Sequence, residues 1–212
     1  MKKTIISILC MPLFVHAAHN QQIMIRYAAP HDLSSLNALS EKQYQNDFKP
    51  LWEKCYKSLF PHVNVEEFII EKTHLNNENN KKIVLDENPD KSSRLLVAEI
   101  KDVESLTNKI AGFCRFEKRD EKTMYMNFIL VDEYFRKQGV AKKLASAAMN
   151  TFPDITTCRF RAHVHNKEIN EIYLKHGCTQ KGQVSIDLDS GKINADPNAP
   201  ITHYDYEYSI KR

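Results

Sequence analysis

The segment 129–144 constrains the fold more than any other part of the sequence. An apolar run that ends at Val131 predicts a buried strand, and a short basic loop containing Gly139 then leads into a helical pattern. A strand followed so closely by a helix aims several backbone N–H groups at one point, at the positive end of the helix dipole. Such a point is suited to an anion such as a pyrophosphate. The sequence therefore predicts an α/β domain that carries an anion-binding loop.

The residues of this loop separate it from the common nucleotide loops. Arg136, Lys137 and Lys142 would add positive charge, and Gly139 would let a phosphate approach the backbone closely. The chain lacks both GxxxxGK[ST] and GxGxxG, which excludes a P-loop and a dinucleotide-binding fingerprint.

The hydrophobic pattern elsewhere predicts a mixed α/β single domain, which also suits a length of 212 residues. Strands are expected over 23–27, 95–100, 109–117, 123–131, 158–164, 183–188 and 203–210. Helices are expected over 32–44, 48–60, 65–75, 135–152 and 166–176. We interpret the stretch 76–93, rich in Asn, Lys and Asp, as a polar loop with a short apolar island at 83–85.

Charge and cysteine content narrow the class of protein further. Lys and Arg total 30 and Asp and Glu total 27, too small an excess for a nucleic-acid or membrane-surface binder. Beyond Cys10, the four cysteines Cys55, Cys114, Cys158 and Cys178 could form two disulfides in three pairings. Because none has CxxC spacing, we expect most of them to be small buried residues. A secreted disulfide-rich protein has little support.

Two motifs carry a resemblance to a known family. Arg136, Gly139 and Ala141 fit the pattern (Arg/Gln)-x-x-Gly-x-(Gly/Ala), which starts five residues after Val131. The second segment, Asn166-Lys-Glu-Ile-Asn-Glu-Ile-Tyr-Leu-Lys-His-Gly-Cys178, matches Asn-x-x-Ala-x-x-x-Tyr-x-x-x-Gly-Phe at its Asn, Tyr and Gly positions. The opening 24–33 is also similar to a first strand and helix start. With these motifs the chain resembles the GCN5-related N-acetyltransferase (GNAT) superfamily.

This resemblance implies a fold and an activity. The fold would be a single GNAT-like domain over 23–212, with a central, mostly antiparallel seven-stranded sheet that is splayed at the coenzyme site and flanked by helices. The activity would be transfer of an acetyl group from acetyl-CoA to a primary amine of a small molecule or a protein, by direct attack and without a metal. The alternative is a non-catalytic acyl-CoA-binding or protein-interaction module on the same fold. The acceptor pocket would be walled by 31–75 and by the loop 189–200.

The resemblance also assigns residues to the coenzyme. The backbone of Ile129, Leu130 and Val131 would pair with the pantetheine arm and donate N–H groups to the oxyanion. The loop and the start of the next helix would hold the pyrophosphate. Asn166 is a further candidate, for which a helix cap and a bond to the coenzyme arm are equal alternatives. The loop residues assigned to the coenzyme are Arg136, Lys137, Gln138, Gly139, Val140, Ala141 and Lys142.

For catalysis, Tyr173 occupies the position of the general acid that protonates the departing thiolate. Its alternative role is a packing aromatic on an amphipathic helix. No carboxylate lies within 125–131, so the candidates for the base that deprotonates the amine are Glu117, Asp132, His163 and His165, and we select His163. His163 and His165 would share a face of a strand, but no third metal ligand is visible, and no metal is predicted.

The N-terminus predicts a targeting segment. Two lysines, an apolar stretch over 5–15 and small residues at 17–18 have the order of a signal peptide spanning 1–17. No apolar run is long enough for a multi-pass membrane protein. A buried N-terminal strand or helix is the alternative. Because acetyl-CoA is cytosolic, we expect either export to a compartment that contains it or a cytoplasmic protein that starts at Met24.

Overall fold

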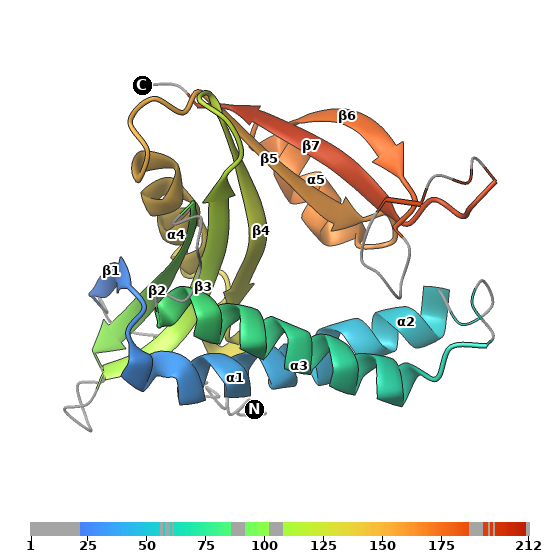
Figure 1. Ribbon diagram of the computed structural model, residues 1–212, viewed down its shortest axis with the longest axis horizontal. Helices are drawn as coiled ribbons and strands as arrows, with labels where there is room; N and C mark the ends of the chain where they lie inside the picture. Colours follow the sequence, from blue (N-terminus) through green and yellow to red (C-terminus); the bar gives the residue numbers. More distant parts are fainter. Residues whose placement is uncertain are drawn as a thin grey trace, which may run out of the picture.

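A seven-stranded sheet forms the centre of the computed structural model (Figure 1). The structure describes residues 22–55, 57, 60, 62–85, 92–101, 108–186, 193–194, 196 and 198–210. The signal peptide expected over 1–17 therefore lies outside the described residues. The described strands are β1 (Ile23–Tyr27), β2 (Ser93–Lys101), β3 (Asn108–Lys118), β4 (Thr123–Val131), β5 (Thr157–His163), β6 (Thr179–Val184) and β7 (His203–Ser209). Their order in the sheet is β1-β2-β3-β4-β5-β7-β6, and only β4 and β5 pair in parallel.

Helices cover both faces of this sheet (Figure 1). They are α1 (Leu33–Gln43), α2 (Lys49–Cys55), α3 (Val65–Val84), α4 (Val140–Asn150) and α5 (Lys167–Lys175), with the short turns η1 (Pro30–Asp32), η2 (Tyr44–Phe48) and η3 (Glu133–Phe135). Leu144 of α4 and Tyr173 of α5 pack on one core with Phe116 of β3. Leu36 of α1 and Val84 of α3 pack on a second core, on the opposite face. The expected mixed α/β sheet flanked by helices is confirmed.

The sheet opens between β4 and β5. These strands pair only at Thr123, Tyr125 and the residue between them, with Thr157–Arg159 as partners, although β4 runs on to Val131 and β5 to His163. Figure 1 shows the two strands diverging beyond this short contact, so that β5, β7 and β6 form a separate arm. The edge of β4 that faces β5 is therefore left without a strand partner over its second half.

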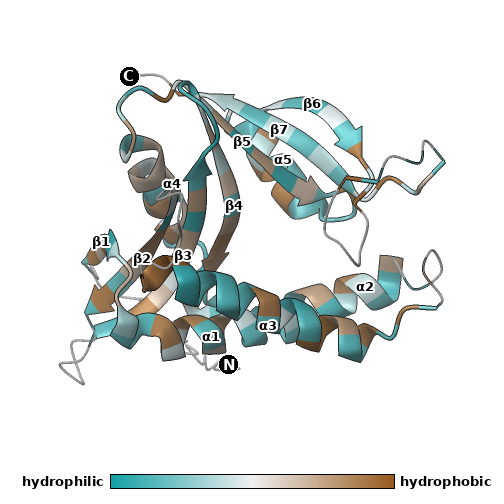
Figure 2. Ribbon diagram, viewed as in Figure 1, coloured by the Kyte–Doolittle hydropathy of each residue, from teal (hydrophilic) through white to brown (hydrophobic). Residues whose placement is uncertain are grey.

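The helix α3 is longer than the sequence pattern indicates. The expected polar loop over 76–93 is wrong in its first part, because α3 continues from Val65 to Val84. Asn64 caps its start by accepting a hydrogen bond from the Glu66 N–H at 3.1 Å. The polar residues Asn76 and Asn80 point inward and are buried, which hides the helical period from a hydrophobicity pattern. Figure 2 shows hydrophobic and hydrophilic segments alternating along this helix.

Two other expected boundaries are wrong. The helix expected over 135–152 begins only at Val140, because 136–139 form a turn in which Lys137 and Gly139 have positive φ angles. The strand expected over 183–188 lies earlier, at Thr179–Val184, since pairing with β7 runs from Thr179 to Val184.

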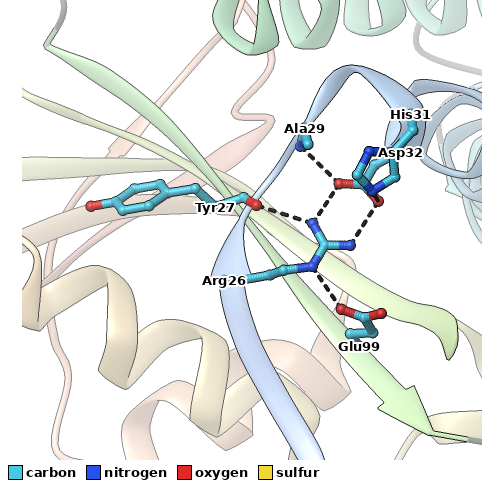
Figure 3. A network of polar contacts seen from close by, with 6 residues as sticks. All are labelled: Arg26, Tyr27, Ala29, His31, Asp32 and Glu99. Carbon is cyan, nitrogen blue, oxygen red and sulfur yellow. Dashed lines mark hydrogen bonds and ion pairs between the residues drawn. The ribbon is translucent and has the colours of Figure 1, made fainter.

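A polar network connects β1 with η1 and with β2 (Figure 3). Arg26 of β1 donates to both carboxylate oxygens of Asp32, at 2.7 and 2.9 Å, and to Glu99 of β2 at 2.6 Å. The N–H of Ala29 also donates to Asp32, at 2.8 Å. Burial acts to raise the pKa of Asp32, but the hydrogen bonds from Arg26 and Ala29 outweigh it, and the pKa lies below its ordinary value. The network sets the angle at which β1 leads into α1.

The four cysteines beyond Cys10 are free thiols. Cys114 and Cys158 are buried, whereas Cys55 and Cys178 are partly exposed. No helix among the described residues combines the length and apolarity needed to cross a bilayer.

Candidate functional site

The loop between β4 and α4 presents a row of backbone donors. Lys137 and Gly139 adopt positive φ angles of 62° and 80°, and Gly139 is the N-cap of α4. The first helical hydrogen bond of α4 runs from the Lys143 N–H to the Gly139 carbonyl, at 3.0 Å. Among the described residues we find no acceptor for the N–H groups of 137–142. A row of unsatisfied donors at a helix N-terminus is an anion site.

Space beside the glycine suits this role. A β-carbon placed on Gly139 would have no heavy atom within 4 Å, so the backbone is open to an incoming group at this point. Lys137 and Lys142, both exposed, add positive charge around it. Gln138 turns back, and its side-chain amide donates to the Tyr134 carbonyl at 2.9 Å.

The side chain of Arg136 is fixed by contacts with two neighbouring segments of the protein. Its two terminal nitrogens contact the carboxylate of Asp47 in η2, at 3.2 and 2.5 Å, and its Nε donates to the Val131 carbonyl at 3.2 Å. The charge of Arg136 is therefore balanced by Asp47. The same side chain ties η2 to the end of β4, which positions the loop. Sequence reasoning missed Asp47, because the two residues lie 89 positions apart.

The open edge of β4 aims backbone N–H groups into the gap between the strands. The Asp132 N–H donates to the Ala111 carbonyl of β3 at 2.9 Å, and hydrogen-bonding direction alternates along an antiparallel strand. By this alternation the N–H groups of Ile129 and Val131 point away from β3 and toward the gap, whereas that of Leu130 points toward β3. A register shift at Asn127, between Met126 and Phe128, adds a bulge just before this stretch.

Tyr173 of α5 packs on the core that α4 also covers. Its ring packs edge-to-face on Phe160 of β5, at 4.5 Å between centroids, and on Tyr206 of β7 at 5.3 Å. Phe160 is the first residue of β5 beyond the contact with β4. Burial, and to a lesser degree the neighbouring Cys178, Cys114 and Cys158, raises the pKa of Tyr173 to about 12. The phenol therefore keeps its proton at neutral pH, as a general acid must.

Two asparagines position this tyrosine's helix. Asn166 caps α5, since its side chain accepts from the Ile169 N–H at 3.3 Å. Asn170, which sequence reasoning missed, is buried and donates to the carbonyls of His163 and Val164 at 3.0 and 3.3 Å. It also accepts from the Tyr206 hydroxyl at 2.9 Å. The sequence signal for Asn170 was a polar residue in the middle of a helical pattern.

His163 has a poor setting for a general base. Its ring lies 4.0 Å from that of His203 and 5.7 Å from that of Phe48. Burial, with a smaller effect of His203 and His165, lowers the pKa of His163 to about 3. A base with this pKa takes a proton from an amine poorly near neutral pH. The described residues contain no group of three or more His, Cys, Asp or Glu side chains that could hold a metal ion.

The structure joins the β4 edge to the loop, and it places Asn166 beside His163, whose carbonyl accepts a hydrogen bond from the Asn166 N–H at 3.0 Å. The N–H groups of β4 lead directly into the loop 136–142, and Tyr173 and Asn166 belong to the neighbouring helix α5, on the face that α4 also covers (Figure 1). His163 lies at the far end of β5, against η2. Part of the loop 189–200, the other expected wall of an acceptor pocket, lies outside the described residues.

Comparisons with known proteins agree with this geometry. The model of the acetyltransferase (GNAT) family matches residues 46–177. A search of curated proteins finds no match. Among solved structures, PaiA N-acetyltransferase of Thermoplasma acidophilum in complex with coenzyme A has a TM-score of 0.61 at 16% identity, covering 89% of this chain and 99% of that one. Arabidopsis thaliana NAA60 in complex with a bisubstrate analogue has a TM-score of 0.55 at 17% identity, covering 90% and 100%. Spermidine N-acetyltransferase of Vibrio cholerae with CoA and spermine has a TM-score of 0.54 at 15% identity, covering 89% and 95%.

Proposed function

Because this chain belongs to the acetyltransferase (GNAT) family, whose model matches more than half of it, we propose that it transfers an acetyl group from acetyl-CoA to a primary amine. The family establishes an acyltransferase. The direct attack, the residues that perform it and the kind of acceptor are our proposal. Solved structures of an N-acetyltransferase with CoA and of a spermidine N-acetyltransferase share the fold, which supports acetyl-CoA as donor and an amine as acceptor.

One observation carries the proposal: the unpaired edge of β4 runs straight into a row of free N–H groups. The pantetheine arm of the coenzyme is an extended chain with amide groups, so it can pair with the β4 edge as a strand would. Its pyrophosphate would then lie at the start of α4, against the N–H groups of 137–142. The open strand edge is followed directly by the anion site. The pantetheine arm and the pyrophosphate of the coenzyme are joined in the same order.

The reaction follows from this placement. The neutral amine attacks the thioester carbonyl, a C–N bond forms, and the carbonyl oxygen becomes an oxyanion beside the N–H groups of Ile129 and Val131. The attack leaves the amine nitrogen positively charged, and it loses one proton to solvent or to a base. The intermediate collapses with cleavage of the C–S bond. The departing thiolate takes its proton from the Tyr173 hydroxyl, and the resulting phenolate regains a proton from solvent. The products are an acetylated amine and CoA.

A thiol-release assay with acetyl-CoA and a panel of primary amines tests this function. We expect amine-dependent release of free CoA together with an acetylated product seen by mass spectrometry. Calorimetric titration with CoA measures coenzyme binding separately. Tight CoA binding without release for any amine would favour the non-catalytic module, and absence of CoA binding would contradict the site itself.

A further inference from the structure

The strand β3, the turn that follows it and the strand β5 carry four arginines, and one of them differs from the rest. Arg119 pairs with Glu117, Arg159 with Glu207 at 3.0 Å, and Arg161 with Asp205 at 2.6 Å. The fourth, Arg115 of β3, has no described carboxylate within ion-pair distance. It is half-buried between β3 and α3, where burial lowers its pKa below the ordinary value.

The partners of Arg115 are neutral amides. Its Nη1 donates to the side-chain oxygens of Asn76 and Asn80 of α3, at 2.9 and 3.1 Å. The Phe128 ring of β4 lies 5.8 Å from the guanidinium carbon. No described residue accepts a hydrogen bond from Nε or Nη2, so one edge of the planar guanidinium is unused.

A second donor in the same cluster also lacks an acceptor. The Nδ2 of Asn80 is fully buried and makes no hydrogen bond, while its Oδ1 is engaged by Arg115. Buried donors are almost always satisfied in folded proteins, and a guanidinium taken from water is usually offset by an anion. The free edge of Arg115 and the free amide of Asn80 are both donors, so an acceptor-rich group, an anion, would satisfy them.

The position of Arg115 connects this cluster to the reaction. Its α-carbon is paired with that of Phe128, the residue before Ile129, whose N–H points into the gap between β4 and β5. Neighbouring strands lie about 4.8 Å apart, so the backbone of Arg115 is one strand away from that edge.

We propose that Arg115, held by Asn76 and Asn80, binds a free carboxylate of the acceptor, so that the acceptor is a small amine of amino-acid type. This inference rests on the proposed function, because it names the substrate class of the same site. A planar guanidinium edge fits a carboxylate through two parallel hydrogen bonds. The alternative is that Arg115 only attaches α3 to the sheet.

The first experiment compares amines that differ only in this group. Each set contains an amino acid, its amide and the amine left after decarboxylation, for example phenylalanine, phenylalaninamide and phenethylamine, or β-alanine, β-alaninamide and ethylamine. In the thiol-release assay we expect kcat/KM for the carboxylate members to exceed that of their partners by at least about tenfold, or about 1.4 kcal/mol. Equal use of the amide or of the decarboxylated amine would overturn the proposal while leaving acetyl transfer intact.

Asn80→Asp separates the ligand role from the structural one. The new carboxylate would pair with Arg115 and keep the attachment of α3, and a thermal melt checks that the variant is folded. It would also neutralise the charge of Arg115 and repel an incoming carboxylate, so KM for the carboxylate amines should rise at least about tenfold, with CoA affinity unchanged. Arg161→Gln is the matched control, because Arg161 already pairs with Asp205, and it should retain the preference.

Binding measured without turnover keeps the two proposals distinguishable. Titration of the protein–CoA complex with the same amino acids and amines measures the anion site directly. Preferential binding of carboxylates that is lost in Asn80→Asp would support the carboxylate site. Absence of acetylation for every amine in the panel would count against the proposed function alone. An unchanged KM and an unchanged titration in Asn80→Asp would show that Arg115 is structural.

Discussion

Tyr173 carries the clearest single-residue prediction. Tyr173→Phe keeps the ring that packs on Phe160 and Tyr206 and removes only the hydroxyl, for which we find no hydrogen-bond partner among the described residues. We therefore expect little change in melting temperature and in CoA affinity. If the phenol protonates the thiolate, kcat should fall by about 100-fold or more in the thiol-release assay.

The pH profile provides a second measurement on this residue. In the wild-type enzyme the basic limb should lie near the raised pKa of about 12, or above the accessible range, because the phenol keeps its proton up to that point. A Phe variant that retains most of its turnover would show that water or another group supplies the proton. Tyr173 would then be a packing residue of α5.

At the scale of elements, the turn before α4 depends on one backbone conformation. Gly139→Ala introduces a side chain at φ 80°, and its methyl group points into open space where a phosphate would approach. We expect CoA affinity to fall about tenfold by calorimetry. Gly177→Ala is a matched control, because Gly177 has φ 82° and equally open space but ends α5 instead of starting α4.

The comparison between these variants isolates coenzyme binding from backbone strain. Both substitutions should lower stability by a similar amount, about 1 kcal/mol. Only Gly139→Ala should weaken CoA. Equal CoA affinity in the two folded variants would contradict the assignment of the loop as the pyrophosphate site.

For the whole molecule, the sequence predicted what depends on local pattern. The strand–loop–helix of 129–144, the order of strands and helices and the positions of Asn166 and Tyr173 follow from periodicity and motif spacing, and the fold they imply is confirmed. The second half of α3 was missed because Asn76 and Asn80 place polar groups on its buried face. The Asp47–Arg136 pair and the Arg115 cluster join residues at least 35 positions apart, which no local pattern contains.

The last prediction concerns the stability, at acid pH, of the contact between η2 and the arm formed by β5, β7 and β6. The ring of His163, at the end of β5, lies against Phe48 of the helical layer and against His203 of β7. Burial, more than their charged neighbours, lowers the pKa of His163 to about 3 and that of His203 to about 4. The unfolded chain binds protons at these sites below about pH 6.5, whereas the folded chain does not, so stability should fall as pH decreases from 6.5 toward 4.

At pH 5.5 the loss should be about 1 kcal/mol for each histidine relative to neutral pH. Thermal melts of the wild-type protein and of His163→Gln between pH 7.5 and 5.5 measure it. The variant lacks the titrating ring, so its melting temperature should decrease a few degrees less over this range, about 2–4 °C for 1 kcal/mol in a domain of this size. His74→Gln, which changes an exposed histidine of α3, should behave as wild type. Equal pH dependence of the melting temperature in wild type and His163→Gln would contradict this prediction. It would show that burial against Phe48 does not keep the His163 ring unprotonated in this pH range.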